Sequence, residues 1–230
     1  MIEQLIGFDT TSRESNLGLI EWVRDWLARQ GVAATLVYDG SGKKANLFAT
    51  VGTGSRPGII LSGHTDVVPV DGQAWDTDPF RPTWRDDRLY ARGACDMKSF
   101  LGVALAMTPR ILTTGLDAPI HFALSYDEEV GCIGVRGLIA ALREQRFGAA
   151  GCIVGEPTSM EVVVANKGKR AFLCDVHGKE AHSALTPEGV NDVGQSIAAF
   201  TPINVAAAPA IGGAVTAKLT IRTFDGLVIE

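Results

Sequence analysis

The chain has 230 residues, of which 46% are hydrophobic and 20% are charged, and its formal net charge at pH 7 is −5. The length suffices for one large domain or for a domain with a smaller companion. The net charge gives no general attraction for nucleic acid or anionic lipid, and no apolar run is long enough to cross a bilayer. The first residues lack the basic start of a secretory signal, and the four cysteines form no CxxC pair. We therefore expect a cytoplasmic protein with reduced thiols and no nucleic-acid or membrane partner.

Strands and helices alternate over the first 169 residues. In chain order, the pattern predicts a helix over 16–30, strands over 45–51 and 58–63, an irregular loop over 71–87, a short strand over 89–91, a helix over 98–112, a strand over 119–125, a helix over 133–146 and a strand over 151–155. Asn16 is the predicted N-cap of the first helix. This alternation favours an α/β domain whose largely parallel sheet is flanked by helices.

The pattern changes from residue 170 onward. Residues 171–177 and 214–224 are predicted strands, and 188–200 is a predicted helix between them. We therefore expect two domains, a larger one over 1–169 and a smaller α+β piece over 170–230.

Polar residues follow the predicted strands of the larger domain at regular intervals. These are His64, Asp96, the pair Glu128 and Glu129, and Glu156. The intervals match one strand-plus-crossover unit of about 30 residues. In parallel sheets, ligands gather beyond the carboxyl ends of the strands, so these side chains are predicted to meet at one edge of the sheet.

One imidazole and several carboxylates suit zinc or a similar divalent ion. Asp66 lies two residues after His64 and would point the same way in an extended segment. It would then accept a hydrogen bond from the imidazole and fix which ring nitrogen faces the metal.

Each of these motifs also has a purely structural interpretation. His64 could be a hydrogen-bonded histidine at a strand end, and Asp96 could be the N-cap of the helix over 98–112. Asp127 could cap the next helix, which would leave Glu128 and Glu129 as first-turn acids. Four independent caps need not recur at strand ends so regularly, and the combination therefore favours a metal site.

Five stretches of the sequence resemble the M20 metallopeptidase family, most closely its acetylornithine deacetylase and succinyl-diaminopimelate desuccinylase branch. They are "SGHTDVVPVDGQAWDTDPF", "GACDMK", "YDEEVG", "VGEPT" and "GKEAHSALTPEGVN". The resemblance extends from residue 1 to about residue 193. It implies a zinc-exopeptidase-like catalytic domain and a small, shortened lid domain.

The resemblance also implies a role for each candidate residue. His64 and Glu156 would bind the first of two divalent ions, zinc or cobalt, Asp96 would bridge both ions, and Glu129 would bind the second. Asp66 would support His64 from behind.

Glu128 would be the general base of the reaction. Two adjacent glutamates can divide these tasks only if the backbone turns there. His182, from the lid, would stabilise the oxyanion.

The implied activity is cleavage of the amide of an N-acyl amino acid, a small-molecule substrate. Acetylornithine deacetylase, an enzyme of arginine biosynthesis, is the preferred assignment, and succinyl-diaminopimelate desuccinylase is the alternative. The resemblance also implies a homodimer formed through the lid.

The chain departs from the family pattern near its end. The pattern includes a C-terminal histidine for the second metal, and none of the four histidines lies in that context. His121 and His177 fall within predicted strands and are interpreted as structural. A catalytically weak or inactive remnant that acts as a binding module is therefore a second hypothesis.

Overall fold

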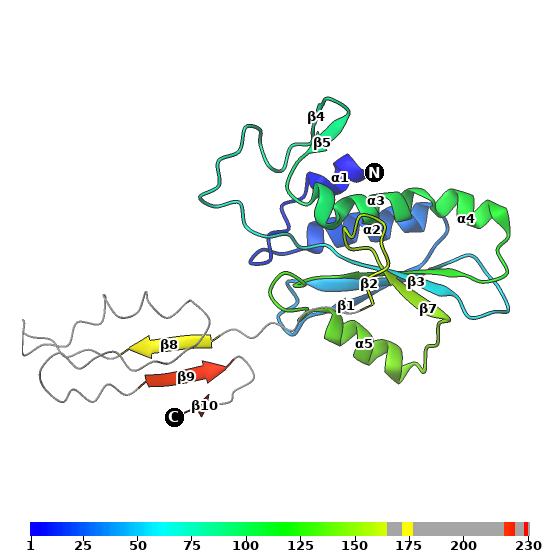
Figure 1. The fold of residues 1–230 in the computed structure, drawn as a ribbon. Helices are drawn as coiled ribbons and strands as arrows, with labels where there is room; N and C mark the ends of the chain where they lie inside the picture. The colour runs from blue at the N-terminus through cyan, green and yellow to red at the C-terminus, as the bar shows by residue number, and fades with distance from the viewer. Residues whose placement is uncertain (165–171, 177–218, 224–227, 230) are drawn as a thin grey trace, which may run out of the picture. The chain divides into compact units, whose positions relative to one another are not determined.

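The computed structural model describes residues 1–164, 172–176, 219–223 and 228–229 (Figure 1). The chain divides into two compact units, Met1–Val162 and Val163–Glu230. Among the described residues, no helix has the length and apolar character needed to span a membrane. The catalytic and lid roles expected for 1–169 and 170–230 stay predictions.

The first unit is built on a five-stranded sheet in the order β1-β2-β6-β3-β7. Its strands are β1 (Ala34–Tyr38), β2 (Ala45–Val51), β3 (Ile59–His64), β6 (Ile120–Ser125) and β7 (Gly151–Val154). The predicted α/β architecture is confirmed, but the sheet is mixed rather than largely parallel. β3 pairs in parallel with β6 and β7, whereas β2 is antiparallel to both of its neighbours. The connection between β1 and β2 is too short for a parallel crossover, and the sequence pattern had not indicated β1.

Helices cover both faces of this sheet. They are α1 (Ile2–Ile6), α2 (Leu17–Arg29), α3 (Ser99–Ala106), α4 (Thr108–Thr114) and α5 (Val135–Glu144). Figure 1 shows α1 to α4 on one face and α5 on the other. The buried face of α2 is the predicted one, and its apolar side chains pack with Leu47 and Phe122 of the sheet in a single hydrophobic core.

Asn16 stands at the N-terminus of α2, but its side chain does not cap the helix as predicted. Its amide instead bonds to both backbone groups of Ala45, at 2.9 and 3.0 Å, and donates to the Thr65 hydroxyl at 3.0 Å. The buried amide thus connects α2, the start of β2 and the segment after β3, and these hydrogen bonds satisfy it in place of a cap.

Two predicted segments have a different structure. The helix expected over 98–112 is divided, because Pro109 lacks the N–H that a continuous helix needs and instead lies in the first turn of α4. The loop expected over 71–87 contains β4 (Thr83–Arg85), which pairs with β5 (Arg88–Tyr90). Asp86 and Asp87 have positive φ at the tip of this hairpin, a conformation that aspartate tolerates and tight hairpin turns require.

The second unit contains a three-stranded antiparallel sheet in the order β10-β9-β8. β8 (Phe172–Val176) and β9 (Leu219–Thr223) confirm the two predicted strands, and β10 (Val228–Ile229) adds a short third one. The helix predicted over 188–200 lies outside the described residues.

His121 should make the stability of the first unit depend on pH. The imidazole is buried between Phe48 and Phe147, its Nδ1 lies 2.9 Å from the Thr50 hydroxyl, and burial lowers its pKa. The unfolded chain therefore binds a proton that the folded protein resists, and stability falls as the pH drops below the unfolded value of about 6.5. In His121→Gln, the free energy of unfolding, measured with urea, should fall less between pH 6.5 and pH 5 than in the parent.

Thr50→Val is the matched control, because it removes the hydrogen bond but keeps the imidazole. Its pH dependence should equal that of the parent protein. Equal slopes for His121→Gln and the parent would show that His121 does not contribute.

Candidate metal centre

β3 brings His64 to the carboxyl end of the sheet between its two parallel neighbours. Gly63 permits this arrangement, since a Cβ there would lie 2.7 Å from both Met97 and Leu101. The imidazole is 2% exposed, and its Nδ1–H donates to the backbone carbonyl of Asp66 at 2.8 Å. This hydrogen bond leaves Nε2 facing the carboxylates.

The expected partnership between His64 and Asp66 has a different geometry from the predicted one. The close acceptor is the Asp66 carbonyl, and the nearest carboxylate oxygen lies 3.5 Å from Nδ1. The Asp66 carboxylate instead accepts the backbone N–H groups of Glu128, at 3.0 Å, and Glu129, at 3.2 Å. Asp66 therefore orients the imidazole with its backbone and the glutamate pair with its side chain.

Glu128 and Glu129 follow β6 on a tight turn, which is the backbone turn that the roles implied by the resemblance would need. Asp127 has a φ of 55°, and the backbone N–H of Gly131 bonds to the carbonyl of Glu128 at 2.9 Å. Lys44 forms an ion pair with the Asp127 carboxylate. α5 begins only after Gly134 and has no side-chain cap, so the interpretation of Asp127 as its cap is wrong.

Glu156 follows β7, the other parallel neighbour of β3. Gly155 donates its N–H to the Ser62 carbonyl at 3.0 Å, which extends the pairing between the strands. A Cβ on Gly155 would lie 2.2 Å from the ring of Phe100, so only glycine fits. Glu156 comes next, and its Oε1 lies 3.8 Å from His64 Nε2.

Asp96 reaches the site by another route than the one predicted. It does not follow a strand of the main sheet but lies in a short helical turn, Ala94–Lys98, where its own backbone angles are non-helical. Its Oδ1 lies 2.9 Å from His64 Nε2. Asp96 does not cap α3, whose N-cap position is Lys98. The spacing of 32 residues between His64 and Asp96 therefore does not reflect a strand-plus-crossover unit. The two side chains nevertheless lie together, as predicted.

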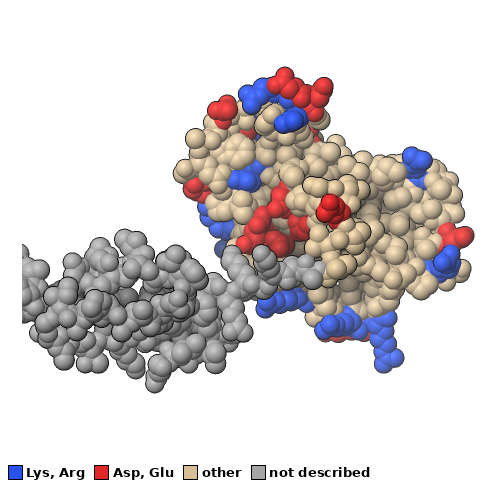
Figure 2. All heavy atoms as spheres, in the orientation of Figure 1, with Lys and Arg blue, Asp and Glu red and all other residues tan. Residues whose placement is uncertain are grey.

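The side chains fall into two groups with potential ligand atoms within 4.8 Å of one another. One group is His64, Glu128 and Glu156, and the other is His64, Asp96 and Glu129. Figure 2 shows acidic side chains gathered in one place on the visible face. One imidazole and four carboxylates are a donor set typical of zinc and related divalent ions.

The electrostatics of this cluster favour a cation. Burial, and then the charge of Asp96, raise the pKa of Glu129, and burial likewise raises the pKa of Glu156. Burial of His64 opposes its ionisation, but its interactions with Asp66 and Asp96 outweigh this and raise its pKa to about 10. Carboxylates crowded in this way destabilise one another, and a positive charge among them relieves the repulsion. The residues therefore fit a divalent ion.

The sequence analysis missed three residues that support the site from behind. Ser12 donates to the Asp66 carboxylate at 2.7 Å, and Lys44 donates to the Ser12 carbonyl. Lys98 is 0% exposed and donates to the carbonyl of Phe8 at 2.7 Å. The polar run Asp-Thr-Thr-Ser before α2 was the available signal, because its three hydroxyl side chains are buried and need partners.

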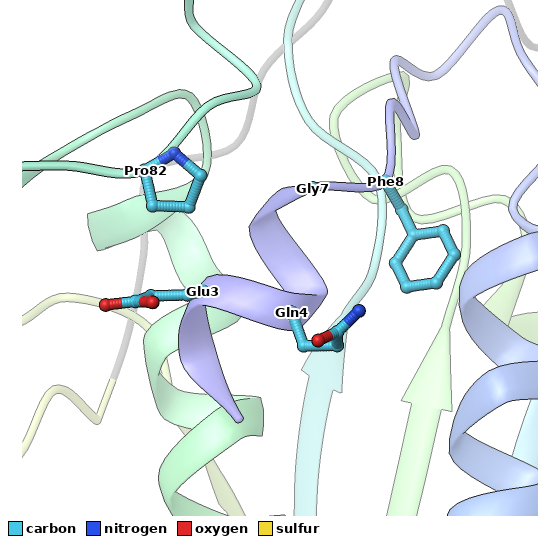
Figure 3. Close-up of a pocket in the computed structure, with 5 residues that line it drawn as sticks. All are labelled: Glu3, Gln4, Gly7, Phe8 and Pro82. Carbon is cyan, nitrogen blue, oxygen red and sulfur yellow. The ribbon is translucent and has the colours of Figure 1, made fainter.

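A separate hollow beside α1 offers no comparable chemistry (Figure 3). It measures about 390 Å³ and is lined by Glu3, Gln4, Gly7, Phe8 and Pro82. Glu3 is its one carboxylate, and it already accepts a hydrogen bond from Trp84 at 2.6 Å. His182, expected from the second unit, lies outside the described residues, as does His177.

Solved structures of three peptidases share this fold. An M20 family metallo-carboxypeptidase from Sulfolobus solfataricus matches 81% of this chain and 45% of its own, with a TM-score of 0.64 and 21% identity. A tripeptidase from Staphylococcus aureus matches 96% of this chain and 62% of its own, with a TM-score of 0.59 and 20% identity. Human carnosine dipeptidase 1 gives a TM-score of 0.58 over 66% of this chain and 36% of its own, at 22% identity.

Curated relatives are more similar in sequence. An acetylornithine deacetylase from Myxococcus xanthus is 40% identical over 84% of this chain and 50% of its own length. One from Pasteurella multocida is 34% identical over 78% of this chain and 46% of its own length. The chain thus spans about half the length of the curated relatives it matches. Residues 60–225 match the family described as Peptidase family M20/M25/M40, and the chain belongs to this family.

Proposed function

We propose that this chain provides the metal-binding part of a hydrolase that cleaves the amide bond of an N-acyl amino acid. The observation that carries the proposal is the convergence of His64, Asp96, Glu128, Glu129 and Glu156 on one edge of the sheet. Membership of the M20 family supports it, since peptidases of this fold also act on amide bonds.

Two divalent ions are proposed, zinc or cobalt, as the imidazole and carboxylate donors allow. His64, Asp96 and Glu156 would hold the first, and Asp96 and Glu129 the second. The 2.9 Å contact between His64 and Asp96 supports their sharing an ion. A divalent ion bound there would lower the pKa of a bound water and polarise an amide carbonyl.

Glu128 is the proposed general base. Both glutamates of the turn reach the cluster, but Glu128 Oε2 lies 4.0 Å from His64 Nε2, farther than the contacts of Asp96 and Glu156. A carboxylate beside the ligands can accept the proton of the attacking water and then donate it to the departing amine. The two backbone hydrogen bonds to Asp66 fix the turn from which this carboxylate extends.

The proposed substrate is N-acetylornithine, because the curated relatives at 34–40% identity are named acetylornithine deacetylases. The role proposed for His182, the homodimer through the second unit and the place in arginine biosynthesis rest on the resemblance. The proposed cytoplasmic location rests on the cysteine pattern.

Replacing Glu128 with Gln tests the proposed base. The amide cannot accept the proton, so kcat should fall by about 100- to 10,000-fold while metal content is kept. Hydrolysis of N-acetylornithine, with N-succinyl-diaminopimelate in parallel, measures the activity, and elemental analysis of the same sample measures the metal. Glu144→Gln, at the end of α5, is the control and should leave kcat unchanged.

Full activity in Glu128→Gln would refute the role of Glu128 as base. Faster hydrolysis of the succinylated substrate would replace the proposed substrate with the alternative one. Absence of hydrolysis of either substrate by the parent chain would contradict the proposed activity of this chain.

Metal binding should release protons and strengthen with pH. The pKa of His64 is about 10 without metal, so at pH 7 the imidazolium must lose a proton before it can bind an ion. The affinity for Zn²⁺ should therefore rise about tenfold per pH unit between pH 6 and 8 if one proton is released. Calorimetric titration in two buffers of different ionisation enthalpy measures the protons released.

His121→Gln serves as the control for this measurement. His121 lies outside the cluster, and its replacement should leave the proton release unchanged. A Zn²⁺ affinity that does not vary over this pH range would rule out displacement of a proton from His64.

A further inference from the structure

The buried carboxylate of Asp66 accepts hydrogen bonds from the glutamate turn and from Ser12. Oδ1 accepts the N–H of Glu128, and Oδ2 accepts the N–H of Glu129 at the longer distance of 3.2 Å. Oδ2 also accepts the hydroxyl of Ser12 at 2.7 Å. With Asp66 only 2% exposed, water cannot readily replace a lost donor.

The hydrogen bond from the Ser12 hydroxyl is the shortest one to this carboxylate, and Ser12 lies far from Asp66 in the sequence. Its other acceptor, the Val67 carbonyl, lies at 3.5 Å, so its proton points to Asp66. The carboxylate accepts hydrogen bonds from Ser12, Glu128 and Glu129 and is almost completely buried, so the loss of the shortest of these bonds is not easily compensated.

The segment that carries Ser12 is firmly placed beside the strand end. Ser12 N–H bonds to the Val67 carbonyl and Val67 N–H to the Thr10 carbonyl, both at 3.1 Å, and the Thr10 hydroxyl donates to the Thr65 carbonyl. Lys98 secures the start of the segment through Phe8. Because both ends are fixed, the hydroxyl of Ser12 has a defined direction.

We propose that Ser12 is a positioning residue for the glutamate turn, acting through Asp66. Its hydrogen bond fixes the rotation of the carboxylate, so that each oxygen meets one backbone N–H of Glu128 and Glu129. Without it, the carboxylate can turn toward its other donors, and the weaker bond to Glu129 is released first. The inference rests on the proposed function only in assigning the glutamates to metal binding and catalysis; the hydrogen-bond chain can be tested without metal.

The neighbouring residue provides a matched control. Thr11 is buried like Ser12, with 1% against 9% exposed, and its hydroxyl also donates to an aspartate carboxylate, that of Asp9, at 2.7 Å. Asp9 contacts neither glutamate in the described part of the chain. Thr11→Val therefore removes a hydroxyl–carboxylate hydrogen bond of the same length from the same segment without touching Asp66.

The experiment compares Ser12→Ala and Thr11→Val with the parent chain in two measurements. The first is amide hydrogen exchange at Glu128 and Glu129 in metal-free protein. We expect about tenfold faster exchange in Ser12→Ala and no change in Thr11→Val. The second is titration with Co²⁺ followed by its visible absorption. We expect an affinity about tenfold lower in Ser12→Ala, as for other residues that orient metal ligands, and an unchanged affinity in Thr11→Val.

Thermal unfolding of all three proteins shows whether they are folded to the same extent. Parental exchange rates at Glu128 and Glu129 in Ser12→Ala would overturn the inference, as would equal acceleration in both variants, which would indicate a general effect on the segment. A parent chain that binds no Co²⁺ would instead contradict the proposed function, while the exchange rates would still decide the role of Ser12.

Discussion

The site depends on one buried carboxylate. Asp66 is hidden from solvent, and its oxygens accept the two adjacent N–H groups of the glutamate turn. Its carbonyl accepts the proton of His64 Nδ1, which directs Nε2 toward Asp96. A single residue thus orients the imidazole of one candidate ligand and the backbone of two further ones. An uncompensated charge at this depth would be costly, and the surrounding donors make it stable.

The parallel part of the sheet explains why the candidate ligands meet. β6, β3 and β7 end at the same edge. His64 is the last residue of β3, and Glu128 and Glu156 follow within three residues of the ends of β6 and β7. Close packing completes the arrangement: Gly63 admits Met97 and Leu101, and Gly155 admits the ring of Phe100. The crowded carboxylates repel one another, which lowers the stability of the fold and raises the affinity of the cluster for a cation.

The sequence predicted those parts of the site that follow from strand direction. His64, Glu128, Glu129 and Glu156 each come after an apolar run, and period and chain direction suffice to bring them together. The sequence pattern did not explain how Asp96 joins this cluster, because the turn that carries it has irregular backbone angles. The polar run that contains Ser12 indicated a need for hydrogen-bond partners, but not that the partner of Ser12 is Asp66, 54 residues away in the sequence. The hairpin β4–β5 was missed for a local reason, two aspartates with positive φ.

The distribution of these contacts along the chain has a thermodynamic consequence. Residues from Ser12 to Glu156 take part, which is nearly the whole of the Met1–Val162 unit. No short fragment of the chain can assemble the cluster, so an ion that binds it recognises only the fully folded unit. Occupancy and folding are then linked by mass action, and each tenfold excess of free ion over its dissociation constant adds about 1.4 kcal/mol to the stability of the fold.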